Sequence, residues 1–195
     1  MKSFGTLGIV VAILAVLLIA GCSNYNGFVD AEENMEQSWS NVETQYQRRS
    51  DLIPNLVNTV KGAAEFERGT LEAVTNARSR ASSITIEAND LTPEKLAEYQ
   101  AAQGQLSQGL GRLLATAENY PNLKSNAQFQ ELQAQLEGTE NRIAVARDRF
   151  NESATSFNKK VRRFPGTVFA SVFGFEEKPQ FKAEAGSAQA PTVEF

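Results

Sequence analysis

The stretch FQELQAQLEGTENRIAVARDRFNESATSFNKKVRRF, residues 129–164, decides the expected fold. An apolar side chain recurs in it every seven residues, at Phe129, Leu136, Ile143, Phe150, Phe157 and Phe164. A seven-residue apolar repeat on an α-helix forms a seam around which partner helices wrap with a left-handed twist. At about 1.5 Å per residue this helix is roughly 50 Å long, and it cannot fold alone with that face in water. The repeat therefore predicts a long helix packed against others.

Three further amphipathic segments can supply those partner helices. They span about residues 27–49, 52–81 and 93–120. Asp51 is suited to cap a helix start, and Pro54 is tolerated in the first turn of a helix. We therefore expect the chain to break near Ser50, and one longer helix kinked at Pro54 is the alternative.

Four helices joined by short links favour an all-α fold, an antiparallel up-and-down four-helix bundle with a left-handed twist. The expected division of the chain has three parts. They are a signal or anchor segment at residues 1–22, the bundle at residues 23–166, and an apolar strip with a flexible C-terminal tail at residues 167–195.

The composition excludes several classes of function. The chain has 195 residues, 42% of them hydrophobic, a net charge of −4 and no histidine. An acidic chain lacks the basic surface of a general nucleic-acid binder. Without histidine there is no Ser–His or Cys–His nucleophile pair, and the commonest metal ligand is missing. The single cysteine, Cys22, excludes an intrachain disulfide and a cysteine-rich zinc site. We expect no cofactor, no metal, no nucleic-acid partner and no enzymatic activity.

The N-terminal stretch MKSFGTLGIVVAILAVLLIAGC, residues 1–22, is typical of an export signal or a membrane anchor. Lys2 precedes an apolar run at residues 7–19, which is short for a membrane-spanning helix. The sequence IAGC at residues 19–22 resembles a bacterial lipobox, in which the cysteine, here Cys22, is lipidated and becomes the new N-terminus. An uncleaved anchor helix is the alternative. Because the positive charge lies before the apolar run, both alternatives place the body outside the cytoplasm, on the periplasmic or cell-surface side.

Four motifs carry a resemblance to a known family. They are NYNGFVDAEENMEQSW at residues 24–39, RRSDLIPNLV at 48–57, ENYPNLKSNAQFQELQAQLEGTENRIAVARDRFN at 118–151, and FNKKVRRFPGTVFASVFGF at 157–175. Together they resemble the LemA family of bacterial membrane-anchored proteins. The resemblance implies a four-helix bundle on an N-terminal anchor with no established enzymatic activity, and it does not supply a biochemical function.

An up-and-down bundle that starts at the membrane has its first and third turns at the far end. With a turn near Ser50, the RRSDLIP and ENYPNLKS motifs meet there. The candidate partner surface consists of Arg48, Arg49, Asp51, Tyr120, Pro121 and Lys124. A structural role is the alternative, because the arginines can complement a helix C-terminus and pair with Glu118, while the prolines fix the turns.

The same topology returns the fourth helix to the membrane. Its basic last turns precede an apolar strip, a composition typical of a segment at the membrane interface. The candidate membrane-contact residues are Lys159, Lys160, Arg162, Arg163, Phe169 and Phe173. Alternatively, the basic residues complement the helix dipole and the strip folds back over the bundle.

Four charged residues lie at or next to seam positions, namely Glu67, Arg78, Glu140 and Arg147. We expect ion pairs that fix helix register here and not a metal site, since bundle carboxylate sites include Glu-x-x-His motifs. The predicted function is a non-enzymatic, membrane-anchored envelope protein that acts as an interaction or scaffold module for an unknown envelope protein. The alternative is a hydrolase of envelope glycans that uses carboxylates alone, which needs a cleft.

Overall fold

The computed structural model describes residues 2–62 and 67–182, and within these ranges the chain is helical without any strand. The long helices are α1 (Lys2–Lys61), α2 (Arg68–Ser83), α3 (Pro93–Ala117) and α5 (Ala127–Arg162). The short ones are the 3-10 turn η1 (Ala88–Asp90), α4 (Pro121–Lys124) and α6 (Gly166–Phe173). The prediction of an all-α chain with an apolar N-terminal helix is confirmed.

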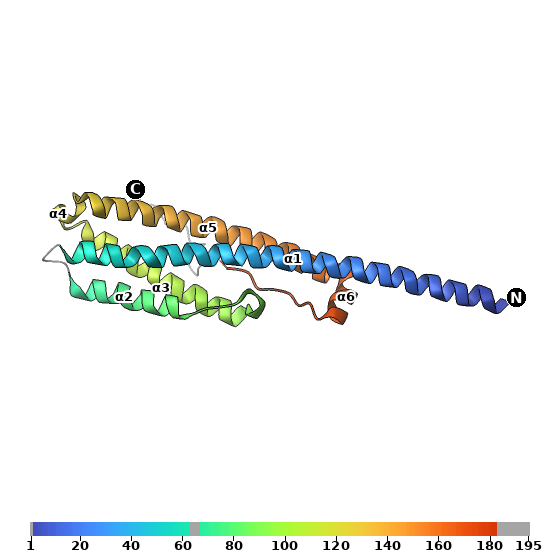
Figure 1. The fold of residues 1–195 in the computed structure, drawn as a ribbon. Coiled ribbons are helices and arrows are strands. Elements are labelled where there is room, and N and C mark those ends of the chain that lie inside the picture. Colours follow the sequence, from blue (N-terminus) through green and yellow to red (C-terminus); the bar gives the residue numbers. More distant parts are fainter. Residues whose placement is uncertain (1, 63–66, 183–195) are drawn as a thin grey trace, which may run out of the picture.

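The four long helices lie side by side and alternate in direction (Figure 1). α1 packs against α5, and α2 packs against α3. We call the end at α4 and the C-terminus of α1 the distal end. The end at α6, from which the apolar N-terminal section of α1 projects, is the proximal end (Figure 1).

The predicted helix break near Ser50 is wrong. α1 continues to Lys61 with Pro54 inside it, so the alternative of one longer helix holds. Burying four apolar side chains contributes about 6–12 kcal/mol, which exceeds the cost of about 3 kcal/mol for a proline inside a helix. The side chains buried on this extension are Ile53, Leu56, Val57 and Val60.

The seven-residue seam of α5 is buried at every position except the last. The buried members are Phe129, Leu136, Ile143, Phe150 and Phe157. Phe164 is 84% exposed because α5 ends at Arg162, so the seam stops before reaching it. The prediction that all six positions belong to the core is therefore wrong for Phe164.

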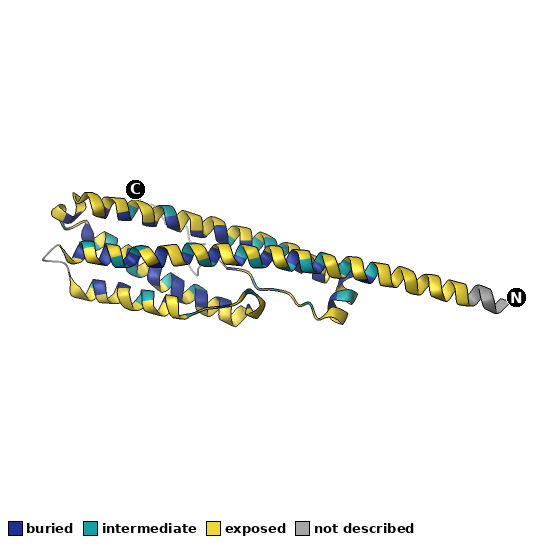
Figure 2. Cartoon of the chain, in the orientation of Figure 1, coloured by how far each residue is buried: buried dark blue, intermediate teal, exposed yellow. Residues whose placement is uncertain are grey.

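The core has three sections along its length, and Figure 2 shows buried residues along the helices of the body but not on the projecting N-terminal section of α1. The distal cluster joins mainly aliphatic residues of all four long helices, among them Leu56, Val60, Val74 and Leu113, together with Phe129. The middle cluster is rich in aromatic residues, with Trp39, Tyr46, Tyr99, Phe150 and Phe181 among its members. The proximal cluster consists of Phe28, Ala31, Phe157, Val161 and Ala170.

The chain after α6 does not form a flexible tail over residues 176–182. This segment runs along α5 and inserts Phe181 into the middle cluster. α2 and α3 do not extend over the proximal part of α1 and α5, so other segments cover the aromatic side chains there (Figure 1). The rest of the expected tail, residues 183–195, lies outside the described residues.

Candidate functional site

The N-terminal section of α1 has the properties of a membrane anchor. Within the described residues, α1 is the one helix that is long and apolar enough to cross a membrane, judged by length and composition. Its large apolar side chains from Leu7 to Ile19 are 48–70% exposed, whereas the same helix is buried against its neighbours from Phe28 onward. Cys22 is exposed and lies between these two sections. One continuous helix therefore connects an unburied apolar section to the folded body.

α6 lies directly beside this junction. The Phe169 ring lies beside Gly21, since a Cβ at Gly21 would lie 3.5 Å from Phe169 Cε1, an ordinary van der Waals contact. Phe173 packs edge-on against Tyr25, with 5.2 Å between ring centroids, and stacks on Phe169 at 6.2 Å. The apolar strip thus folds back on α1 through the two phenylalanines that were predicted to contact the membrane.

Other apolar side chains of the same region face outward. Phe164 is 84% exposed, Val168 53% and Val172 73%. The four predicted basic residues, Lys159, Lys160, Arg162 and Arg163, are all exposed nearby on the last turns of α5 and just after it. We call these seven residues the proximal collar. An apolar surface flanked by cations matches the composition of interfacial membrane segments.

Two of the collar cations also have protein partners. Lys160 Nζ donates a hydrogen bond of 2.7 Å to the carbonyl oxygen of Gly27 on α1. Arg162 Nε lies 3.8 Å from Glu177 Oε2. These exposed contacts leave the cations at the surface, so their charge remains available to anionic groups outside the protein.

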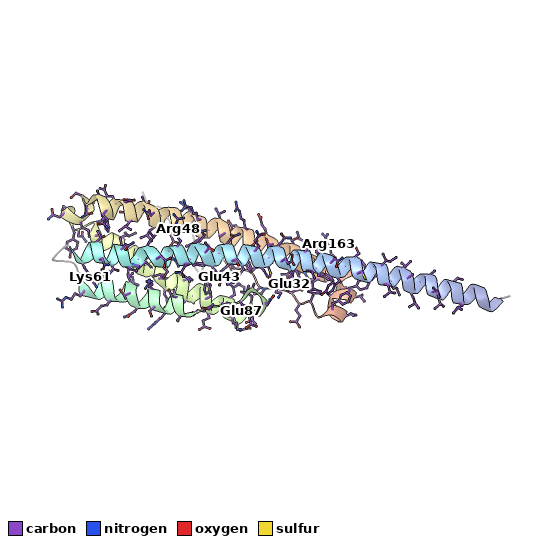
Figure 3. All side chains as sticks on the ribbon, viewed as in Figure 1. Glu32, Glu43, Arg48, Lys61, Glu87 and Arg163 are labelled. Carbon is purple, nitrogen blue, oxygen red and sulfur yellow. The ribbon has the colours of Figure 1, made fainter. Side chains whose placement is uncertain are left out.

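The predicted partner surface does not gather at one end of the molecule. Tyr120, Pro121 and Lys124 lie at the distal end, where Lys124 forms an ion pair with Glu118. Arg48 lies partway along α1, whereas Lys61 marks its distal end (Figure 3). The twelve residues from position 49 to position 61 correspond to about 18 Å of helix. Because α1 does not turn near Ser50, the two motifs remain separated.

Arg49 is a buried structural residue and not a surface one, with 1% exposure. Its Nη1 donates hydrogen bonds to Glu140 Oε1 at 2.7 Å and to Ser107 Oγ at 2.6 Å. Its Nη2 donates to Gln103 Oε1 at 2.5 Å, and its guanidinium lies 5.0 Å from the centre of the Tyr46 ring. One guanidinium thus connects α1, α3 and α5, which fixes their relative register.

The Arg49 network joins the RRSDLIP motif to the TENRI part of the α5 motif. The sequence contained a signal for the burial of Arg49, because Met35, Val42, Arg49 and Leu56 are spaced by seven. The expected helix break concealed this signal. Glu140 was correctly placed in a register-fixing ion pair, whereas the neutral partners Gln103 and Ser107 were missed because uncharged polar residues carry no comparable pattern.

The other seam charges have different surroundings. Arg78 Nε donates a 2.9 Å hydrogen bond to the carbonyl oxygen of Ser50, and Arg147 covers the Phe181 ring at 4.8 Å from its centre. Glu67 is exposed immediately before α2. Within the described residues, no group of three or more His, Cys, Asp or Glu side chains is arranged to hold a metal ion.

A polar groove of about 900 Å³ lies between α1, α3 and the chain that follows α2. Its rim includes Arg48 and Asp51, and its lining includes Glu43, Tyr46 and Tyr99. Burial raises the pKa of Glu43 above its ordinary value and also raises that of the Tyr99 hydroxyl. Tyr46 and Tyr99 are each 5% exposed and belong to the middle cluster, so the groove presents mainly polar side chains of α1, such as Arg48 and Asp51, to a partner.

The carboxylates of this groove do not favour glycan hydrolysis. Glu43 and Asp51 are eight residues apart on one helix, which corresponds to a rise of about 12 Å. The paired carboxyl groups of glycosidases are about 5–9.5 Å apart. In addition, Asp51 accepts a 2.8 Å hydrogen bond from Gln47 Nε2 in an exposed position.

Comparison with known proteins adds the family. The LemA family model matches residues 38–195. The chain is 28% identical over 194 residues to magnetosome protein MamQ 1 of Paramagnetospirillum magneticum. This alignment covers 89% of this chain and 68% of that protein. It is 28% identical over 192 residues to magnetosome protein MamQ of Magnetospirillum gryphiswaldense, covering 88% and 68%. It is 24% identical over 139 residues to protein LemA of Metamycoplasma hominis, covering 71% and 60%.

Neither family name denotes a known enzyme, and the relatives together with the apolar helix indicate a membrane-associated protein. The family model spans most of the chain, including three of the four motifs in full. The protein belongs to the LemA family.

Proposed function

We propose that this protein is a non-catalytic scaffold anchored in the membrane, with its helical body outside the cytoplasm. In this proposal the four long helices act as an antiparallel four-helix bundle with a left-handed twist. The observation that carries the proposal is the continuity of α1, which runs from the exposed apolar section into the core without a break. In the uncleaved form, this helix connects the membrane-crossing section directly to the body without an intervening loop.

The proximal collar is the proposed membrane-contact surface. If residues 7–19 cross the membrane, α6 lies at the level where they leave it, because Phe169 packs on Gly21. If Cys22 carries a lipid after cleavage, the same level is the membrane surface. Both anchoring modes therefore support contact of Phe164, Val168 and Val172 with the acyl-chain boundary, and of the neighbouring cations with lipid headgroups.

Protein partners are proposed to bind the body at two separate places. The first is the polar groove with Arg48 and Asp51 on its rim, and the second is the distal end at Pro121 and Lys124. These replace the single surface expected from the sequence. Arg49 supports partner binding indirectly, because its network fixes the helices that form the groove.

Photo-crosslinking in living cells tests the proposal. A photoreactive amino acid is placed in the full chain at residue 47 on the groove, residue 124 at the distal end or residue 172 in the collar. We expect lipid adducts at residue 172 and a discrete protein adduct at residue 47 or 124. Residue 145, an exposed apolar position on α5, is the matched control. Equal yields of lipid adducts at residues 172 and 145, or no discrete protein adduct at residues 47 and 124, contradict the proposal.

Lipidation of Cys22 is tested separately. Cys22→Ala blocks maturation and leaves the uncleaved chain in the membrane, while Ser23→Ala is processed as usual. The measurement is the mass of the chain isolated from membranes. If the Cys22→Ala chain has the same mass as the normal mature protein, apart from the substitution, the lipoprotein form is excluded and the uncleaved anchor helix is the remaining alternative.

A further inference from the structure

Residues 178–182 bind to the body as an extended peptide, and we call them the strap. Asn158 forms two hydrogen bonds with the backbone of Lys178, since its Nδ2 donates to the carbonyl oxygen and its Oδ1 accepts from the amide, both at 2.8 Å. Asn151 forms the same pair with the backbone of Phe181, at 3.1 and 2.8 Å. Two asparagines of α5 thus each hold one residue of the strap by its main chain.

The spacing of these asparagines matches an extended chain. Seven residues along an α-helix correspond to about 10.5 Å. Three residues of extended backbone, from position 178 to position 181, correspond to about 10 Å. The repeat of α5 that forms the core seam therefore also places two amide groups in register with a bound peptide.

Side-chain contacts add selectivity. Phe181 is 6% exposed, stacks on Trp39 at 6.0 Å and meets Phe150 edge-on at 5.5 Å. Lys178 Nζ lies 3.0 Å from Glu32 Oε1, and both side chains are largely buried. The surface thus recognises the sequence Lys-Pro-Gln-Phe by a carboxylate at one end and an aromatic pocket at the other. We call this surface the strap site.

The link between α6 and the strap is attached to the body at Phe175, whose ring lies 4.9 Å from that of Phe28 and packs against the proximal cluster, and it is exposed on either side of this residue. α6 ends at Gly174, whose φ of 80° allows a sharp change of direction that glycine adopts readily. Glu176 and Glu177 are exposed, and the contact of this pair with the body is the 3.8 Å approach of Glu177 to Arg162. Once Phe175 leaves the proximal cluster, the four residues 174–177 can span about 14 Å when extended, which exceeds the diameter of a helix.

We propose that the strap site also binds the strap of a second copy of this chain on the same membrane. A neighbouring copy carries an identical Lys-Pro-Gln-Phe segment, so every contact of the strap is preserved after exchange. Reciprocal exchange between two copies thus costs the aromatic contacts of Phe175 but none of the strap itself, and it becomes more frequent as the local concentration rises.

Membrane anchoring favours this exchange, and the inference rests to that extent on the anchoring proposed above. Copies anchored in the same membrane have the same orientation and lie at the same height above it. The strap of one copy therefore lies at the level of the strap site of its neighbour. A two-fold axis normal to the membrane relates two copies that exchange straps reciprocally. The result is a dimer held together through the proximal half of the body.

Disulfide trapping in liposomes tests the exchange. Gln180 Nε2 donates to Thr155 Oγ1, so these two positions face each other across the strap site. In full chains that carry Cys22→Ala, Thr155→Cys is placed in one tagged copy and Gln180→Cys in a second copy with another tag. A single chain that carries both cysteines is the positive control. It is kept dilute in the membrane, and a disulfide within this chain shows that the two positions can be crosslinked.

We expect a mixed disulfide between the two tagged copies, with a yield that rises at least threefold when the protein-to-lipid ratio rises tenfold. Phe181→Ala in the Gln180→Cys copy should remove most of it, as should Asn151→Ala in the Thr155→Cys copy. Val145→Ala, a change at an exposed side chain of α5 outside both the strap site and the collar, should leave the yield unchanged.

The proposal is overturned if the double-cysteine chain closes within itself while the mixed copies never crosslink at any protein density. It is also overturned if the mixed crosslink survives both Phe181→Ala and Asn151→Ala, because the contact then does not use the strap site. Lipid contact of residue 172 is measured independently, so failure of strap exchange leaves the membrane proposal intact.

Discussion

The distal and proximal halves of this protein are held together in different ways. In the distal half, α1, α2, α3 and α5 enclose aliphatic side chains between four helices. In the proximal half, α1 and α5 continue as a pair, and their aromatic residues are covered by the first turns of α3, by η1, by α6 and by the strap. The distal half depends on regular apolar burial, whereas the proximal half depends on a few specific contacts from irregular chain.

Because of this difference, we expect the two halves to differ in how easily they open locally. A core with many buried apolar contacts between four regular helices resists local opening. Segments fixed by a few side-chain hydrogen bonds can detach at lower cost, and in this molecule they lie next to the membrane anchor. Stability and adaptability are therefore separated along one long helix.

The largest expected effect is in the distal cluster. Leu113 is 0% exposed, so Leu113→Ala should destabilise the protein by about 3–4 kcal/mol through lost burial and the cavity left behind. Urea unfolding of the full chain in detergent measures this, with Val145→Ala on the exposed face of α5 as the control. A change below 1 kcal/mol contradicts the description of a tightly packed distal core.

The next effect concerns Arg49, at the boundary between the two halves. Arg49→Ala should cost about 2–3 kcal/mol, because it leaves the polar groups of Gln103 and Ser107 without their donor and removes a large buried side chain. Arg48→Ala, one position earlier and exposed, should change stability by less than about 0.5 kcal/mol. Equal effects of the two substitutions contradict the buried network.

The strap should respond separately from the distal core. Asn158→Ala is expected to cost about 1–2 kcal/mol, since it removes two hydrogen bonds that are partly shielded from water. Hydrogen exchange should accelerate at the amides of Lys178 and Phe181 and remain unchanged at Leu113. Asn141→Ala, an exposed change on the same helix, is the control. Uniform acceleration along the whole chain would show that the two halves do not open independently.

The smallest effect is a pH dependence at the groove. Burial raises the pKa of Glu43 in the folded protein, so folding favours its neutral form. The resulting stability is present below pH about 4.5 and is lost as the pH rises through the raised folded-state pKa. Glu43→Gln should therefore raise the melting temperature slightly at pH 7 and leave it unchanged at pH 3.5. Glu33→Gln, on the exposed face of α1, is the comparison, and an equal response to both changes contradicts the assignment.

The sequence predicted the helical class, the apolar N-terminal section and five of the six core positions of α5 because all of these follow from periodicity. It did not predict that α1 continues through Pro54. The cap and proline signals that favoured a break are visible in the local sequence, whereas the core burial that favours a continuous helix depends on distant residues. The strap was missed for a similar reason. Its sequence is polar and short, and its binding depends on Asn151 and Asn158, whose partners lie 20–30 residues away.

The central claim is that the proximal end lies at the bilayer surface while the distal end is in water. A polarity-sensitive fluorophore attached to Val172→Cys or to Lys124→Cys in the full chain, in a Cys22→Ala background in liposomes, tests it directly. We predict that a quencher attached to lipid acyl chains quenches the label at residue 172 and that aqueous iodide quenches the label at residue 124. Iodide quenching of equal strength at both residues, with no quenching by the lipid-attached group at residue 172, would contradict the claim.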